Sequence, residues 1–262
     1  MSTTEWNAGE YARGSALQQG MAEEVLVEIP FTGREWVLDI GCGDGKVTAE
    51  VAARVPKGEV RGIDPARGMI AYAQEKFGPE RWANLRFALG DARRMEYRAE
   101  FDVVVSFNAL HWVHEQAEVL RGIAAALKPG GRAYLRFVPN NPPKSTMFAN
   151  DETSQQWRWA AAFAGHPSPF AKFTPEEYRA LAEAAGLKVR RIEVREKVWE
   201  FATEEDYRGF FTAGAVAWTQ RLAEAEVAEF VTETMARHRR NNGMGPEERR
   251  HRFCQMAVEL EV

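Results

Sequence analysis

The feature that most constrains the fold is a glycine-rich turn placed between a buried strand and a helix. The run Asp39-Ile40-Gly41-Cys42-Gly43-Asp44-Gly45 follows the apolar segment 35–40 and precedes a helical pattern at 46–54. Glycines at such a junction allow a tight turn and let the backbone approach a ligand that side chains would block. A dinucleotide-binding turn would need another glycine at position 46, which is Lys46. The turn therefore predicts a ligand site of a different kind at the start of an α/β domain.

Strand and helix patterns alternate over the residues around this turn. Buried strands are expected at 35–40, 59–64, 85–89, 101–107 and 132–138, and helices at 46–54, 66–77 and 116–127. Such alternation is typical of βαβ units, in which a parallel sheet is covered on both faces. The sequence thus predicts an α/β fold of the Rossmann-like type.

The rhythm changes after residue 138. Thr174 and Pro175 predict the start of a helix that runs to Gly186, because they supply an N-cap and a proline in the first turn. Residues 187–194 and 197–201 are interpreted as two strands joined by a tight turn, and everything from 203 onward as helical. We therefore expect a domain at 1–202 followed by a C-terminal helical extension at 203–262.

Composition excludes several classes of protein. The net charge of −4 and the pI near 5.9 argue against a general nucleic-acid-binding protein. The only cysteines, Cys42 and Cys254, argue against a disulfide framework or a cysteine-rich metal site, and the histidines lack metal-ligand spacing, so no metal is expected. No signal peptide or apolar membrane span is visible, and we expect a cytoplasmic protein without a membrane partner.

Acidic residues follow two further strands at the edge where the glycine turn lies. Asp64 closes the second strand, where a carboxylate can accept the hydroxyls of a ribose, and Asp91-Ala92 follow the third, within reach of an adenine amino group. Asp39 and Asp44 flank the glycine turn itself and form an acidic rim, which suits a ligand carrying an amino group and a sulfonium better than a pyrophosphate.

In these runs the chain resembles the class I S-adenosylmethionine-dependent methyltransferases. The resemblance rests on residues 37–45, 62–64, 90–92 and 127–131, which occur in order. It implies S-adenosyl-L-methionine as the cofactor, with S-adenosyl-L-homocysteine as the product. It also implies a seven-stranded, mostly parallel sheet of order 3-2-1-4-5-7-6 whose seventh strand is antiparallel.

The end of the fourth strand, Ser106-Phe107-Asn108-Ala109-Leu110-His111-Trp112, resembles small-molecule carboxyl methyltransferases of the trans-aconitate and juvenile hormone acid type. That resemblance implies that Trp112 and Gln18 bind the acceptor carboxylate, that Tyr11 closes over the methionine end of the cofactor, and that Asn108 lies at the cofactor. A carboxylate is ionised at pH 7 and needs no base. We therefore expect O-methylation of a small-molecule acid by in-line displacement.

Other functions remain open at this point. His111 is the best candidate for a base, which would matter for a phenol, amine or carbon acceptor; the alternative is that it stacks under the adenine or simply packs in the core. A carrier-bound acid and a non-catalytic cofactor-binding regulator are further alternatives. An N-terminal helix at 5–30 and an aromatic insert at 139–173 are expected to line the acceptor pocket, the aromatic residues forming its roof. The basic runs 237–240 and 249–252 are interpreted as a solvated helix face, the alternative being a surface that binds an acidic carrier protein or nucleic acid.

Overall fold

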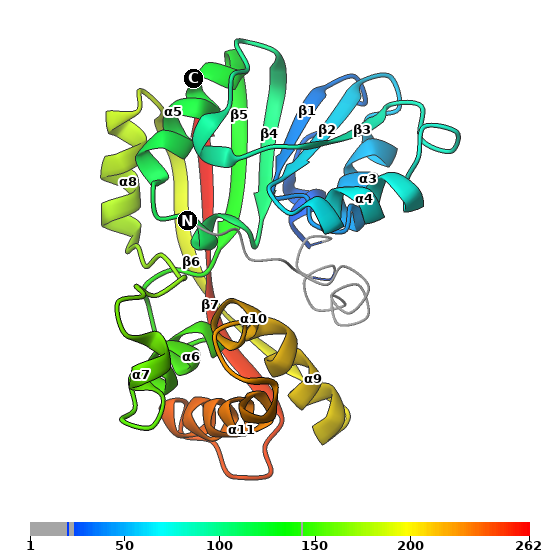
Figure 1. The fold of residues 1–262 in the computed structure, drawn as a ribbon. Coiled ribbons are helices and arrows are strands. Elements are labelled where there is room, and N and C mark those ends of the chain that lie inside the picture. Colours follow the sequence, from blue (N-terminus) through cyan, green and yellow to red (C-terminus); the bar gives the residue numbers. More distant parts are fainter. Residues whose placement is uncertain (1–19, 21–23, 143) are drawn as a thin grey trace.

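Seven strands form one sheet in the order β3-β2-β1-β4-β5-β7-β6 (Figure 1). The computed structural model describes residue 20, residues 24–142 and residues 144–262. The strands are β1 (Trp36–Ile40), β2 (Glu59–Asp64), β3 (Leu85–Leu89), β4 (Phe101–Phe107), β5 (Leu127–Phe137), β6 (Lys188–Glu200) and β7 (Arg250–Glu261). All neighbouring pairs are parallel except those that involve β7. The expected strand order, with an antiparallel seventh strand, is confirmed.

Helices cover both faces of this sheet and form a separate group at one end. They are α3 (Lys46–Arg54), α4 (Arg67–Lys76), α5 (Gln116–Ala126), α6 (Thr146–Ser154), α7 (Ala160–Phe163), α8 (Pro175–Ala184), α9 (Glu204–Gly214), α10 (Val216–Thr219) and α11 (Glu224–Asn241), with short 3-10 turns η1 (Ala92–Arg94) and η2 (Leu110–Trp112). Within the described residues, none of these helices is long and apolar enough to span a bilayer.

Two apolar clusters hold the helices to the sheet, one on each face. Leu38 and Val104 point to the cluster completed by α5 and α8. Val37 and Val105 point to the other face, where α3, α4 and a helical turn at 24–28 pack. Because side chains alternate along a strand, neighbouring apolar residues of β1 and β4 serve opposite faces, which is why these strands are continuously hydrophobic.

The origin of β7 overturns part of the sequence interpretation. Residues 188–200 form one uninterrupted strand rather than a hairpin, and the antiparallel partner comes from 250–261, a segment with a helical prediction. The expected boundary at residue 202 is therefore wrong for the sheet, since the 203–262 segment supplies the strand between β5 and β6. The helices expected after residue 203 do occur, as α9, α10 and α11.

A cap of α6, α7, α9, α10 and α11 lies beyond one end of the sheet (Figure 1). The pairing of β5 with β7 ends at Phe137 and Met256, whereas the pairing of β6 with β7 continues to Glu200 and Arg250. This two-stranded extension carries the chain into the cap. Phe137 is at the carboxyl end of β5, so the cap lies at the edge where ligands bind in parallel α/β sheets.

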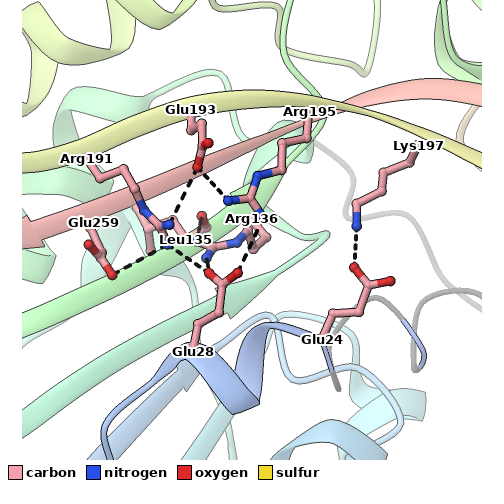
Figure 2. A network of polar contacts seen from close by, with 9 residues as sticks. All are labelled: Glu24, Glu28, Leu135, Arg136, Arg191, Glu193, Arg195, Lys197 and Glu259. Atoms are coloured by element: carbon pink, nitrogen blue, oxygen red, sulfur yellow. Dashed lines mark hydrogen bonds and ion pairs between the residues drawn. The ribbon is translucent and has the colours of Figure 1, made fainter.

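Ion pairs tie the helical turn at 24–28 to the sheet (Figure 2). Glu28 accepts hydrogen bonds from Arg191 at 2.8 Å, Arg136 at 3.2 Å and Arg195 at 3.4 Å. Glu24 pairs with Lys197 of β6. Arg136 is 3% exposed, so its charge is stabilised mainly by Glu28 and by the Leu135 carbonyl to which it also donates.

Candidate active site

A cavity of about 600 Å³ lies between the carboxyl edge of the sheet and the cap. Its wall combines loops that follow β1 to β4 with side chains of the insert, α9, α10 and β7. The wall includes, from the sheet side, Gly41, Gly43, Asp64, Asp91, Ala92, Asn108, His111 and Trp112, and from the cap side, Phe210, Arg221, His251 and Phe253. This volume is typical of a small-molecule site.

The glycine turn after β1 forms the floor of the cavity. Gly41 has φ 77° and donates its N–H to the Ile63 carbonyl at 2.8 Å, which holds the turn against β2. A Cβ on Gly41 would lie 2.2 Å from the Cβ of Ala109. Gly43 has φ 53°, but open space surrounds the place where its Cβ would be. The turn is thus a cradle in which Gly41 is required by packing and Gly43 by conformation.

Asp39 and Gly45 lie behind this cradle, outside the part of the cavity wall that the described residues form. Asp39 is 1% exposed and accepts a 2.7 Å hydrogen bond from the Thr48 hydroxyl on Oδ2. Its Oδ1 has no hydrogen-bond partner among the described residues. Burial raises the pKa of Asp39 to about 7. Gly45 packs against Phe87 and Ala73, where a Cβ would be within 2.9 Å of both side chains.

Asp64 faces the cavity at the end of β2 and is held by two backbone donors. Gly43 donates to one carboxylate oxygen at 3.1 Å and Ala66 to the other at 2.9 Å. Each oxygen keeps a further lone pair, so the carboxylate can still accept two hydroxyl groups. Burial raises the pKa of Asp64, and the two backbone hydrogen bonds oppose that rise.

Asp91 forms an ion pair that the sequence did not predict. Arg93 donates to both oxygens, from Nε at 2.9 and 3.1 Å and from Nη2 at 2.6 Å. The Arg93 hydrogen bonds hold the pKa of Asp91 below its usual range. Arg93 also pairs with Glu115 at 3.4 Å. Asp91 and the adjacent Ala92 both line the cavity, as their positions after β3 predicted.

The loop after β4 is fixed from below by a polar side chain. Asn108, with φ 55°, donates its N–H to the Arg136 carbonyl at 2.8 Å. Gln116 donates at 2.7 Å to the carbonyls of both Leu110 and Val113, and accepts a hydrogen bond from the Tyr178 hydroxyl at 3.1 Å. These contacts define the backbone of η2, which carries two of the predicted site residues.

His111, on η2, is a neutral hydrogen-bond donor in this environment. It is 3% exposed, and burial lowers its pKa to about 3. The Val138 N–H lies 3.5 Å from Nδ1 and can only donate, so the ring proton resides on Nε2. A base with such a low pKa removes protons poorly from a phenol with a pKa near 10.

Trp112 lies in the cavity wall next to His111. Their ring centroids are 5.1 Å apart, and Trp218 of α10 packs edge-on against Trp112 at 5.9 Å. Trp218 is anchored by a 3.0 Å hydrogen bond from Nε1 to Asp151, which pairs with Lys172 at 2.6 Å. The cap therefore fixes the position of an aromatic ring that belongs to the sheet side of the cavity.

Several expectations are corrected or fall outside the described residues. Tyr11 and Gln18 lie in the part of the chain that is not described. The insert does line the cavity, through Met147 and residues 166–169. Its aromatic residues do not form the roof, because Trp159 and Phe170 are buried in the cap core and Trp157 is 90% exposed.

The sequence interpretation missed the cap side of the wall. Arg221 and His251 line the cavity, although they belong to the predicted helical extension and the predicted solvated basic run. The second basic run instead begins β7, where Arg252 pairs with Glu196 of β6. The alternation of apolar and polar residues from Val258 to Val262 is a signal that could have indicated a strand.

Comparisons with known proteins agree with this geometry. A family model described as "Methyltransferase domain" matches residues 37–131. The trans-aconitate 2-methyltransferase of Deinococcus radiodurans is 30% identical over 188 residues, covering 69% of this chain and 69% of that protein. The enzyme of the same name from Streptomyces coelicolor is 32% identical over 187 residues, covering 69% of this chain and 61% of that protein.

A solved structure shows the same fold. It is phosphoethanolamine N-methyltransferase 2 of Haemonchus contortus in complex with S-adenosyl-L-methionine. The TM-score is 0.64 at 16% identity, with 96% of this chain and 56% of that chain covered.

Proposed function

Because the chain belongs to the class I S-adenosylmethionine-dependent methyltransferases, we propose that this enzyme methylates a carboxylate oxygen of a small-molecule acid. The relatives named above act on trans-aconitate, which is a carboxylic acid, and this supports the same class of acceptor here. The cavity geometry supports it independently.

The cradle after β1 fits the cofactor. Backbone at Gly41 and Gly43, both of which line the cavity, would carry its methionine part, and a Cβ at Gly41 would displace this turn by its clash with Ala109. Asp64 would accept the ribose hydroxyls, while Asp91 and Ala92 would lie at the adenine and Asn108 at the loop above it. S-adenosyl-L-methionine supplies a methyl group on a sulfonium, and its positive charge suits the acidic rim.

Asp39 and Gly45 would act from behind the cradle. Asp39 shapes the turn through Thr48 and places a partly ionised carboxyl beneath it. Gly45 lets α3 begin against Phe87 without a clash. Tyr11 and Gln18 remain proposed as contacts to the cofactor and the acceptor, on the resemblance alone.

The state of His111 is the observation that carries the choice of acceptor. A phenol or an ammonium acceptor must lose a proton, and the buried, neutral His111 is a weak base. A carboxylate needs only donors and alignment. The Nε2–H of His111, together with Trp112, gives this cavity wall a polar edge suited to a carboxylate.

A methyl-transfer assay tests the proposal. The full chain is incubated with tritiated S-adenosyl-L-methionine and a panel of mono-, di- and tricarboxylic acids, phenols and amines. Products are then treated with mild base, which releases methanol from methyl esters and leaves ethers and methylamines intact. We expect volatile label from at least one acid, and label that stays bound after base treatment would overturn the proposal.

Two matched variants test whether the acceptor is methylated in this cavity. Trp112→Ala is expected to lower turnover of the acid about tenfold or more, because the wall that aligns the acceptor is lost. Trp157→Ala is the control, since that side chain is 90% exposed and lies outside the cavity wall. Equal activity of the two variants would remove Trp112 from the acceptor site.

A further inference from the structure

A buried chain of three side chains runs through the cap and ends at the cavity. The Tyr207 hydroxyl of α9 lies 3.1 Å from Nδ1 of His238 on α11. Nε2 of His238 lies 3.3 Å from Nδ1 of His251 at the start of β7. Their exposed fractions are 0%, 0% and 4%, and His251 is part of the cavity wall.

The backbone fixes the direction of every hydrogen bond in this chain. Nε2 of His238 also lies 3.5 Å from the Arg252 carbonyl, which can only accept. Burial lowers the pKa of His238 to about 4 and that of His251 well below its usual value, so both rings are neutral. Burial also raises the pKa of Tyr207 to about 12, so its hydroxyl keeps its proton.

The tautomers follow from these two facts. His238 must carry its proton on Nε2, where it donates to the Arg252 carbonyl and to His251. Its Nδ1 therefore accepts from the Tyr207 hydroxyl. Nδ1 of His251 in turn accepts, which leaves the proton of that ring on Nε2. Because Nδ1 is engaged within the cap, Nε2–H is the donor that His251 can offer to a molecule in the cavity.

Packing holds the His251 ring in this orientation. Phe253 stacks on it with a centroid distance of 4.8 Å and an interplanar angle of 13°. Phe210 packs on it as well, also at 4.8 Å. Both rings line the cavity, so the donor lies between two apolar side chains of the wall. A fixed donor in apolar surroundings is selective for a ligand oxygen, since a ligand without one leaves the donor unpaired.

A cation lies in the same cap wall. Arg221, two residues after the end of α10, donates from Nη1 to the Ala217 carbonyl at 2.6 Å. No acidic side chain of the described residues forms an ion pair with it. A guanidinium with open donors next to a cavity favours an anionic ligand group.

We infer that His251 and Arg221 bind a second carboxylate of the acceptor, at the end away from the methyl group that is transferred. Tyr207 and His238 are positioning residues, which fix the Nε2–H tautomer of His251. This inference rests on the proposed function, and it narrows the acceptor to acids with at least two carboxylates.

The first test reads the tautomers directly, without activity. Nitrogen-15 NMR of the histidine-labelled chain distinguishes Nδ1–H from Nε2–H rings. We expect Nε2–H at both His238 and His251, and a rise of the Nδ1–H form at both rings in Tyr207→Phe, which removes only a hydroxyl. The control is Tyr134→Phe, a buried tyrosine of β5 outside the cavity wall, which should leave both rings unchanged. An Nδ1–H form of His251 in the unmodified chain would overturn this assignment of the hydrogen bonds from Tyr207 through His238 to His251.

The second test compares two acceptors that differ in one group. These are the best acid found in the methyl-transfer assay and its analogue with a methyl group in place of the distal carboxylate. We expect Tyr207→Phe and His251→Gln to raise KM for the diacid about tenfold to a hundredfold. Tyr207→Phe, whose side chain is not among the described residues that line the cavity, should not change the affinity for S-adenosyl-L-methionine, or KM for the monoacid by more than about twofold. Equal effects on both acids, or no effect on the diacid, would overturn the inference.

The two tests separate this inference from the proposed function. If no acid accepts the label, the proposed function fails, and the proposed binding of a second carboxylate fails with it. The NMR experiment still tests the hydrogen-bond chain from Tyr207 to His251 in that case. If acids are methylated but Tyr207→Phe treats diacid and monoacid alike, only the present inference fails.

Discussion

The ion pairs of Glu28 allow a quantitative prediction about what holds the helical turn at 24–28 to the sheet. Glu28→Gln leaves the Arg136 guanidinium, 3% exposed, with the Leu135 carbonyl but without its carboxylate partner. Removing one partner of a buried pair costs about 3–5 kcal/mol, and the 36% exposure of Glu28 places this case lower, at about 2–3 kcal/mol. For a chain of this size that corresponds to a fall in melting temperature of about 5–10 °C.

Glu24→Gln is the matched control, because the ion pair that it removes is more exposed. The side chain of Glu24 is 62% exposed, and that of its partner Lys197 is 24% exposed. An exposed pair contributes less than about 1 kcal/mol. Melting temperature and urea denaturation, read by far-UV circular dichroism, should therefore separate the two variants. Adding Arg136→Met to Glu28→Gln should recover most of the loss, since the unpaired buried charge is then gone.

The stability difference between Glu28→Gln and the unmodified chain should depend on pH with a definite sign. The Arg191 hydrogen bond above all lowers the pKa of Glu28 in the folded protein, so its stabilisation is complete above the usual value of 4.5. It is lost as the pH falls through the lowered pKa. The stabilities of Glu28→Gln and the unmodified chain should thus converge in acid. Equal losses for Glu24→Gln and Glu28→Gln at pH 7, or no recovery in the double variant, would refute this reasoning.

Three further predictions concern the cavity and the turn behind it. Gly41→Ala should abolish cofactor binding measured by calorimetry, because its Cβ would lie 2.2 Å from that of Ala109, whereas Gly43→Ala should weaken binding less; similar affinities would contradict this. Asp39→Asn should gain stability relative to the unmodified chain as the pH rises from about 4 to 7. Folding raises the pKa of Asp39 from 3.8 to about 7, so over this range ionisation of Asp39 favours the unfolded state of the unmodified chain. A difference in unfolding free energy between the two proteins, measured by urea denaturation, that stays constant across that range would argue against it. The pH profile of kcat/KM for an acid acceptor should show no inflection from His111 between pH 5 and 9, since its pKa is about 3; an inflection near 6.5 that disappears in His111→Asn would count against a neutral donor.

Local signals in the sequence predict the sheet side of the site. The cradle at Gly41 and Gly43, and the acidic positions Asp64 and Asp91, follow directly from strand ends and turn residues. Their relative placement depends only on short βαβ connections, whose geometry is strongly restricted. Strand ends and turn glycines are therefore enough to place this part of the wall.

The cap side is not predictable in the same way. His251 reaches the cavity because β7 pairs with β6 over 188–200 and with β5 over 132–137, and such long-range pairing leaves little trace in local sequence. The predicted turn at Arg195 and Glu196 is wrong, because neither residue favours a turn and both continue the ladder. A hairpin at 187–201 would pair the two halves of that segment with each other and leave no partner for a strand at 250–261. Because of this one error the sequence interpretation also missed β7 and the hydrogen-bond chain from Tyr207 to His251.

The placement of β7 has a consequence for how the chain is made. During synthesis β5 and β6 leave the ribosome well before residues 250–261, the strand that separates them. At typical elongation rates, β5 waits roughly ten seconds for that neighbour. Throughout this interval the nascent chain presents two open strand edges, which are templates for wrong pairing. A chain that ends before residue 250 would thus keep these strand edges open and would be prone to aggregation. Chaperones that hold nascent chains would have their greatest effect on this protein late in translation.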